Sequence, residues 1–172
     1  VNFRGNKLAM MPDAFADCQA LEFLDISHNA FTQFPAAICR LNKLVTLNLS
    51  RCKLLSVHDA VAGMEMLEML RLEHNQLTDL PSSVGRLKSL THLDVRHNKL
   101  PELRASLAGC TQLTILDARH NNLMKISGEL GYLTCLRRLG LAHNNIAKLP
   151  IELGRLAGIQ DISLHGNVLS FP

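Results

Sequence analysis

The side chains best suited to chemistry in this sequence form a row of imidazoles. One position, recurring every 23 residues, is almost always histidine: His28, Arg51, His74, His97, His120 and His143. On stacked strands these side chains would lie about 5 Å apart, which suggests a metal site or a set of rings that repel one another once protonated below pH ~6.5. The row lacks a second type of metal ligand. We therefore favour a third interpretation, an ordinary feature of the place where each strand ends.

A second group of side chains alternates acid and base over three neighbouring repeats. Residues two apart in a strand share one face of the sheet, so these charges should gather in the middle of one surface. This charged cluster would be either a solvated patch that neutralises itself or a recognition patch, whose charges govern specificity and association rate more than affinity. The charged cluster consists of Arg71, Glu73, Asp94, Arg96, Asp117 and Arg119.

Three apolar side chains are expected to face solvent on the same surface. Phe23, Met69 and Ile115 occupy one repeat position, which Arg138 holds further along the chain. Single exposed apolar residues are ordinary on protein surfaces; the alternative is that they anchor a protein interface. Together with the charged cluster they form the candidate partner-binding surface: Phe23, Met69, Arg71, Glu73, Asp94, Arg96, Ile115, Asp117, Arg119 and Arg138.

Small residues predict a hollow beside this surface. Gly140 and Ala142 stand where other repeats carry charges, and Arg119, Arg137 and Arg138 are expected nearby. Such a hollow could receive an acidic side chain or a phosphate from a partner. The alternative is simply a weaker strand.

The motifs of catalysis are missing from the sequence. It contains no Gly-rich phosphate loop, CxxC pair, HExxH motif or nucleophile elbow. Cys52 follows Arg51 of the histidine row, but consecutive residues should face opposite ways, and an apolar core would raise the pKa of the thiol. We therefore expect no enzyme activity, no catalytic residue, no cofactor and no metal.

A repeated phrase must position all of these residues. Leu67–Pro81 reads LxxLxLxxNxLxxLP, and the phrase recurs every 23 residues without insertion. The repetition predicts one repeat domain, residues 1–172, because repeats are the first organisation to look for. Its parts are a partial repeat 1–20, full repeats starting at 21, 44, 67, 90, 113 and 136, and a partial last repeat 159–172.

The pattern inside each repeat predicts the shape. Apolar residues alternate with polar ones, as in a half-buried strand, and the long return to the next strand requires parallel pairing. Prolines such as Pro81 should begin short helical turns on the opposite limb, and the Asn of each repeat should tie the bends together from inside. The repeat with Ala118 has a small residue in a core row, which Met124 or Tyr132 would have to fill.

Composition and charge indicate which classes of molecule the chain could bind. The net charge is +3, with Lys and Arg scattered among nearly as many acids, whereas nucleic-acid binders concentrate basic residues in a patch. The apolar runs are too short to cross a membrane, and no signal peptide is visible. The five cysteines do not form a clustered disulfide arrangement, which favours a reducing compartment. We expect a monomeric cytoplasmic segment that binds a protein, without nucleic acid or membrane insertion.

The segment Leu80–Leu90 fits the pattern LPxxIGxLxxL, and Leu149–Leu156 repeats its first part. It resembles the 23-residue leucine-rich repeats of intracellular proteins such as Ras-suppressor, Scribble-like and plant intracellular Ras-group repeat proteins. The resemblance implies an α/β leucine-rich repeat solenoid, a curved horseshoe with a parallel sheet on the concave face and short helical or 3-10 turns on the convex face.

The same resemblance implies a function. Proteins of this type bind another protein on the concave face, often within a signalling scaffold. The alternatives are a regulatory or targeting domain of a larger kinase, GTPase, cyclase or ubiquitin ligase, and, less favoured, an extracellular recognition domain.

Overall fold

A computed structural model describes residues 1–170 of the chain. Its main feature is a seven-stranded sheet in which every pair of neighbours is parallel, with equivalent residues 23 apart side by side, as in Phe23 beside Thr46. The strands, in spatial order, are β1 (Phe23–Asp25), β2 (Thr46–Asn48), β3 (Met69–Arg71), β4 (His92–Asp94), β6 (Ile115–Asp117), β8 (Arg138–Gly140) and β9 (Asp161–Ser163). The predicted parallel sheet is confirmed. The predicted last repeat is described as far as Ser170, because Phe171 and Pro172 lie outside the described residues.

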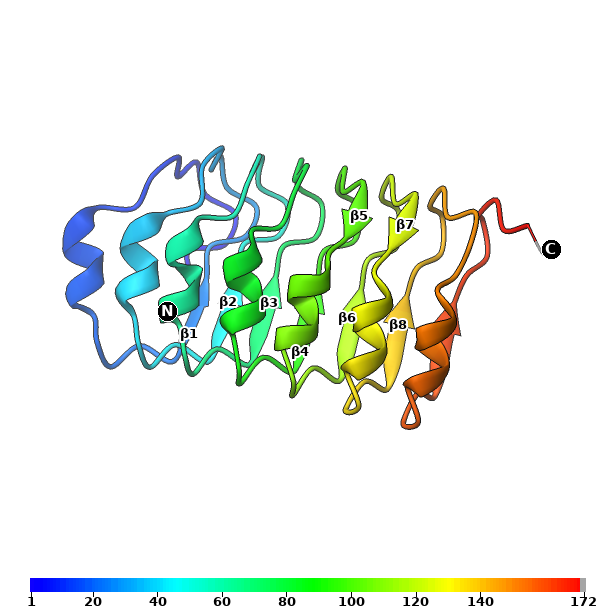
Figure 1. Ribbon diagram of the computed structural model, residues 1–172. Coiled ribbons are helices and arrows are strands. Elements are labelled where there is room, and N and C mark those ends of the chain that lie inside the picture. Colours follow the sequence, from blue (N-terminus) through cyan, green and yellow to red (C-terminus); the bar gives the residue numbers. More distant parts are fainter. Residues whose placement is uncertain (171–172) are drawn as a thin grey trace.

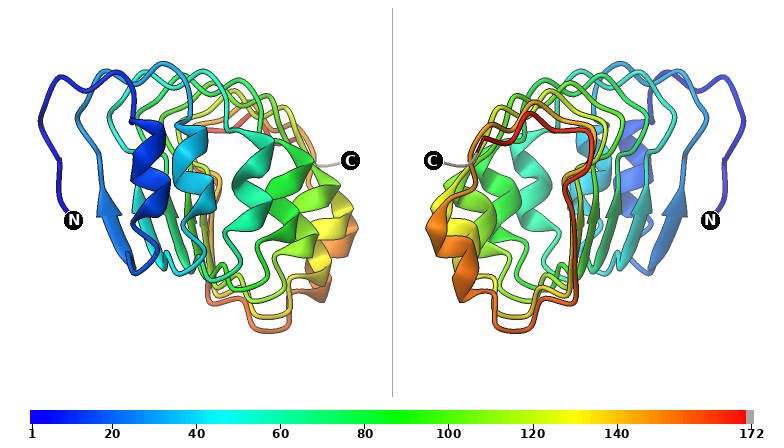
Figure 2. Two further views of the ribbon diagram at one scale, coloured as in Figure 1. Left: turned by 90° about the vertical axis from the view of Figure 1, so that its left-hand side faces the viewer. Right: turned by 90° about the vertical axis from the view of Figure 1, so that its right-hand side faces the viewer.

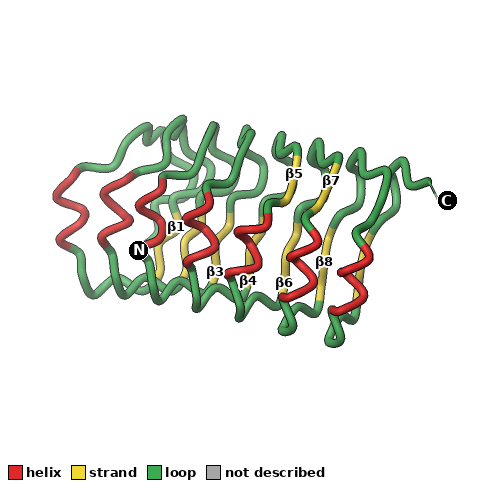
Figure 3. The backbone as a smooth tube through the Cα atoms, viewed as in Figure 1, coloured by secondary structure: helices red, strands yellow, loops and turns green. Residues whose placement is uncertain are grey.

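Short 3-10 helices form the opposite limb of the solenoid (Figures 1 and 3). Pro35, Pro81 and Pro150 precede three of them with φ between −70° and −65°, the angle that the proline ring imposes. His58 replaces proline before η3 and caps that helix, because its Nδ1 accepts the N–H of Ala60 at 3.0 Å. The helices are η1 (Asp13–Asp17), η2 (Ala36–Arg40), η3 (Asp59–Gly63), η4 (Ser82–Arg86), η5 (Ala105–Gly109), η6 (Gly128–Tyr132) and η7 (Ile151–Arg155).

The core fills the space between the two limbs, which the end views separate clearly (Figure 2). It is made of aliphatic rows from successive repeats, and Phe31 is its largest fully buried side chain. Because a helical limb is wider than a strand, the stack bends with its sheet on the concave side. Ala118 is fully buried, and Met124 and Tyr132, the two side chains that could fill the space beside it, are 62% and 59% exposed.

A spine of asparagines ties the repeats together, as predicted. In one unit, Asn98 Nδ2 donates to the carbonyls of Leu72 and Val95, and its Oδ1 accepts the N–H of Leu77, all at 2.9–3.0 Å. The same contacts recur at Asn75 and Asn121. Each side chain therefore satisfies backbone groups of two neighbouring repeats that would otherwise be buried without partners.

A second, two-stranded sheet was not predicted. β5 (Glu102–Leu103) and β7 (Lys125–Ile126) pair in parallel and lie near the top of the view in Figure 1, with the strands of the main sheet lower. Ser127 extends the pairing by donating its N–H to the carbonyl of Leu103 at 3.0 Å, which the proline found there in other repeats could not do. The loss of proline at this position thus adds a backbone contact between repeats.

Candidate protein-binding surface

The concave face carries the predicted surface as rows of equivalent residues. Strand register sets Phe23, Thr46, Met69, His92 and Ile115 side by side across five strands. Arg138 of β8 continues this row. Phe23 is 46% exposed and Met69 and Ile115 are half-buried, so the row presents apolar surface to solvent, although not as isolated protruding side chains.

The charged cluster lies beside this row and is largely paired within itself. Arg119 contacts Asp117 through two hydrogen bonds, Nε to Oδ1 at 2.9 Å and a terminal nitrogen to Oδ2 at 2.6 Å. Arg96 Nε lies 3.2 Å from Asp94 Oδ2, and an Arg96 terminal nitrogen lies 3.9 Å from Asp117 Oδ2. The N–H of Arg96 Nε is not aligned for a hydrogen bond, so its contact with Asp94 is ionic only. These distances favour the self-neutralising interpretation for Asp94, Arg96, Asp117 and Arg119.

The two aspartates of the cluster differ in protonation. Burial raises the pKa of Asp94 to about 6, and the nearby Glu73 carboxylate adds to the effect. Burial also acts to raise the pKa of Asp117, but the hydrogen bonds and positive charge of Arg119 outweigh it, and the pKa of Asp117 is lowered. Asp94 is therefore the carboxylate of the pair that loses its charge first on acidification.

Glu73 does not lie where the sequence placed it. It was expected to face solvent, but only 8% of it is exposed, and its Oε2 has no hydrogen-bond partner among the described residues. Ser27 and Ser50, at the same position in earlier repeats, are 1% and 5% exposed. Arg96 and Arg119, at the same position in later repeats, are only half-buried. Glu73 acts through its charge on neighbours rather than as an accessible contact.

The remaining two cations of the surface are free. Arg71 and Arg138 are exposed, and within residues 1–170 neither forms an ion pair or a side-chain hydrogen bond. They stand on β3 and β8, on either side of the paired Asp94 and Asp117. The charged surface therefore has a neutralised centre and available cations at its flanks.

The predicted hollow at Gly140 is absent. A Cβ at this position would lie 2.8 Å from Asp117 Oδ1 and 3.2 Å from Arg119 Cγ, so the neighbouring side chains occupy the space. Arg137 lies elsewhere, because its guanidinium donates to the carbonyl of Gly158 at 2.9 Å where the chain enters the next strand. The prediction of a hollow for an acidic group was wrong, because side chains from one strand lean over the next.

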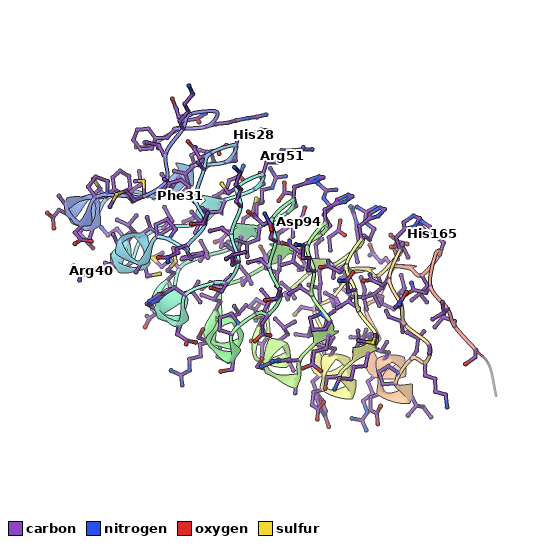
Figure 4. All side chains as sticks on the ribbon, turned by 90° about the horizontal axis from the view of Figure 1, so that it is seen from above. His28, Phe31, Arg40, Arg51, Asp94 and His165 are labelled. Atoms are coloured by element: carbon purple, nitrogen blue, oxygen red, sulfur yellow. The ribbon has the colours of Figure 1, made fainter. Side chains whose placement is uncertain are left out.

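The histidine row is a continuous stack along the edge of the sheet. Rings of His74, His97, His120 and His143 follow one another with centroids 4.2–4.3 Å apart and planes within 12° of parallel. His165 closes one end edge-on, and an Arg51 nitrogen lies 3.3 Å from His74 Nε2 at the other. In Figure 4, His28, Arg51 and His165 lie on the strand side, away from the helices around Arg40.

Backbone geometry explains why histidine is placed there. Every histidine or arginine at this position has φ between 51° and 57°, and Gly5 and Gly166, at the same position in the first and last repeats, have φ of 73° and 70°. His is among the non-glycine residues enriched in this left-handed region. The glycines in register with the histidines are the signal in the sequence from which this conformation could be predicted.

The stack does not resemble a metal centre. Parallel rings direct their nitrogen lone pairs side by side, whereas a metal needs lone pairs that converge on one point. Within residues 1–170, no group of three His, Cys, Asp or Glu side chains could hold an ion. Burial raises the pKa of Cys52, and raises those of Cys39 and Cys110 to about 11, so these thiols remain protonated in the core. Cys18 is exposed.

The repeat geometry agrees with a comparison of the sequence with protein families. The family model described as leucine rich repeat matches residues 4–54 and 65–123. The chain belongs to the leucine-rich repeat family. Leucine-rich repeat domains generally act as protein–protein interaction modules and are typically non-catalytic. Among the described residues, no helix is long and apolar enough to cross a membrane.

Solved structures of other leucine-rich repeat proteins superpose closely. A leucine-rich repeat protein of Leptospira interrogans is 32% identical, with a TM-score of 0.96 over 99% of this chain and 43% of its own. An internalin of Listeria monocytogenes is 21% identical, with a TM-score of 0.81 over 94% of this chain and 46% of its own. The chain thus spans less than half the length of either protein. No curated protein matches the sequence.

Proposed function

We propose that this leucine-rich repeat segment is a scaffold or adaptor module that binds a partner protein across its concave sheet. The partner contacts the apolar row of Phe23, Met69 and Ile115 and the free cations Arg71 and Arg138. The charged pairs between these groups fix the orientation of the partner through charge complementarity. The five cysteines are free thiols, which supports a reducing, cytoplasmic location.

The exposed apolar row carries this proposal. Most of the Leu and Asn side chains that build the solenoid are buried, and backbone hydrogen bonds to both neighbouring strands satisfy the interior of the sheet. The fold therefore does not require Phe23, Met69 and Ile115 to be apolar. A row of such residues on a rigid surface, flanked by unpaired arginines, has the composition of the apolar and Arg-rich contacts that dominate protein interfaces.

Two isoleucine variants test the proposal. Ile115→Glu places a charge in the concave row, whereas Ile151→Glu places the same charge on the convex side, where Ile151 is 90% exposed. Both immobilised variants and the wild type are incubated at pH ~7.5 with an extract of the source cells, and the retained proteins are quantified by mass spectrometry. We expect Ile115→Glu to lose proteins that the wild type and Ile151→Glu both retain. Equal retention by all three would refute the concave site.

A direct measurement follows from the same variants. The protein retained most selectively is purified and titrated against each by calorimetry. Loss of an interface anchor costs roughly 2 kcal/mol or more, or about thirtyfold in Kd, so Ile115→Glu should weaken binding by at least that factor. Thermal melts of both variants establish that the loss comes from the surface rather than from unfolding.

A further inference from the structure

The histidine stack has a chemical property that the proposed function does not use. Four of its imidazoles are in face-to-face contact, and His97, His120 and His143 are exposed along their edges. Arginine can only donate hydrogen bonds, so the 3.3 Å contact from Arg51 requires His74 Nε2 to be unprotonated. The His74 end of the stack is therefore uncharged and lies against the Arg51 cation.

The surroundings favour the neutral form of three of these rings, His74, His97 and His120. Burial lowers the pKa of His74 and His97, and the positive charges of Arg51 and Arg96 lower both further. Burial, the adjacent histidines and Arg119 lower the pKa of His120. Glu73 and Asp117 oppose these effects but do not reverse them. An added proton on these three rings is disfavoured because burial and the neighbouring cations outweigh the two carboxylates.

The charges beside the stack would favour an anion that approached it. Arg51 is exposed, and Lys53 and Lys99, two residues after Arg51 and His97 in the chain, are exposed as well. The carboxylates that balance Arg96 and Arg119 lie deeper on the concave face, and Asp94, whose pKa burial raises to about 6, becomes neutral on mild acidification. Acidification thus adds positive charge to the edge and removes negative charge behind it.

We propose that the edge formed by Arg51, His74, His97, His120 and His143 docks an acidic polypeptide segment, and that the segment and protons bind together. The proposal deepens the proposed function by naming the chemistry of one part of the partner. Carboxylates of the segment supply the counter-charge that the stack lacks, so each bound carboxylate makes protonation of the adjacent ring more favourable. Linkage then requires the affinity to rise as pH falls.

Substitution by asparagine removes the titrating imidazole and keeps the backbone conformation. Asparagine tolerates the left-handed backbone conformation of these positions and does not titrate, so His97→Asn/His120→Asn interrupts the stack without straining the chain. His28→Asn is the matched control, because His28 has the same conformation, with φ of 54°, and no stacking partner among the described residues. Melting curves verify that both variants are folded.

The experiment measures binding of a soluble Glu-Gly repeat peptide at pH ~5.5 and ~7.5 by calorimetry, with a Gln-Gly peptide and polyuridylate as comparisons. We expect the wild type and His28→Asn to bind the Glu peptide about tenfold more tightly at the lower pH, and the double variant to lose most of this gain. NMR titration of the stacked rings should show their pKa values rising when the peptide is present.

Several outcomes would overturn the proposal. Equal affinity for the Glu peptide at the two pH values would show that protons and the peptide do not bind together. Equal binding of the Gln peptide would show that the edge does not recognise carboxylates. A pH gain that survives undiminished in the double variant excludes the stacked pair His97 and His120 as its source and overturns the role of the stack. Binding of polyuridylate but not of the peptide assigns the edge to a different class of partner. None of these outcomes bears on the Ile115→Glu comparison, which is made at one pH with the whole partner.

Discussion

The contact between η6 and η7 offers a sharp test of how neighbouring repeats hold together. Gly131 is buried in η6, and a Cβ at this position would lie 2.1 Å from the carbonyl oxygen of Glu152 in η7. Gly154 is the equivalent residue of η7, and a Cβ there would meet nothing within 4 Å. The change Gly→Ala therefore adds the same methyl group at the two positions, but the methyl group clashes with a neighbouring backbone at Gly131 and has free space at Gly154.

The expected magnitudes follow from this geometry. Neither glycine has a positive φ, so alanine at either position restricts the unfolded chain and stabilises by about 0.4–1 kcal/mol. At Gly131 the Cβ must also push two backbones apart by roughly 1 Å, and overpacking of this kind costs about 1–3 kcal/mol. We expect a net loss of stability for Gly131→Ala and a small gain for Gly154→Ala. For a chain of this size, each kcal/mol shifts Tm by about 2–4 °C.

The assay is thermal and urea denaturation followed by circular dichroism, with hydrogen exchange to locate the effect. Because repeat stability is a sum of local and nearest-neighbour contributions, faster exchange in Gly131→Ala should concentrate in the amides of η6 and η7. If Gly131→Ala is as stable as Gly154→Ala, the close approach of the helical limbs does not stabilise the array. A uniform increase of exchange over all repeats would also refute the nearest-neighbour reasoning.

Two further predictions concern the spine and the cluster. Asn98→Ala should lower the free energy of unfolding by about 1–3 kcal/mol, because the buried Leu77 N–H loses its partner and the carbonyls of Leu72 and Val95 each lose one of two donors; the exposed Asn122→Ala is the control, and identical melts for both would contradict the spine. Asp94→Asn should raise stability by about 1 kcal/mol at pH ~7.5, because the folded protein holds this carboxylate ionised against a raised pKa. The gain should shrink as pH falls through about 6, where wild-type Asp94 takes up its proton. Asp117→Asn should instead destabilise at pH ~7.5, because its lowered pKa reports a stabilised charge, and urea denaturation giving the same sign for both variants would refute the assignment.

The repeat period was enough to predict the fold because it constrains residues that face inward. Leu70 and Leu93 must stack at equal depth, and Asn75 and Asn98 must reach the same carbonyls in each bend. A change at one of these positions would disturb two neighbouring repeats, so the sequence repeats the same residue types. The parallel register, the concave sheet and the asparagine spine are therefore readable from spacing alone.

The candidate surface was predictable only in part, because outward residues interact across strands in ways that spacing does not encode. The prediction that Phe23, Arg71 and Arg138 are exposed on the sheet face was correct. Burial of Glu73 does not follow from its repeat position, because Arg96 and Arg119 at the same position are half-buried. The filling of the space at Gly140 depends on how Asp117 and Arg119 lean. The β5–β7 pair depends on a backbone N–H at Ser127 that becomes relevant only when its neighbour is known.

The charged residues of the concave face fall into two groups, those that already form hydrogen bonds or ion pairs within the protein and those that do not. Asp25, Asn48, Asp94 and Asp117 occupy one position, and the Oδ1 of each accepts the backbone N–H two residues later at 2.9–3.2 Å. Asn48 makes this contact without a charge, so the position needs an acceptor rather than an anion. Local structure thus accounts for these side chains before any partner is considered.

Arg71 stands at the same position and cannot accept that hydrogen bond. It gives up the local stabilisation and leaves an exposed cation without an ion pair among residues 1–170. A residue that departs from the pattern of its row, with no compensating contact inside the protein, is better explained by something outside it. Arg71 therefore supports partner recognition more strongly than Arg96 or Arg119, whose charges the fold already neutralises.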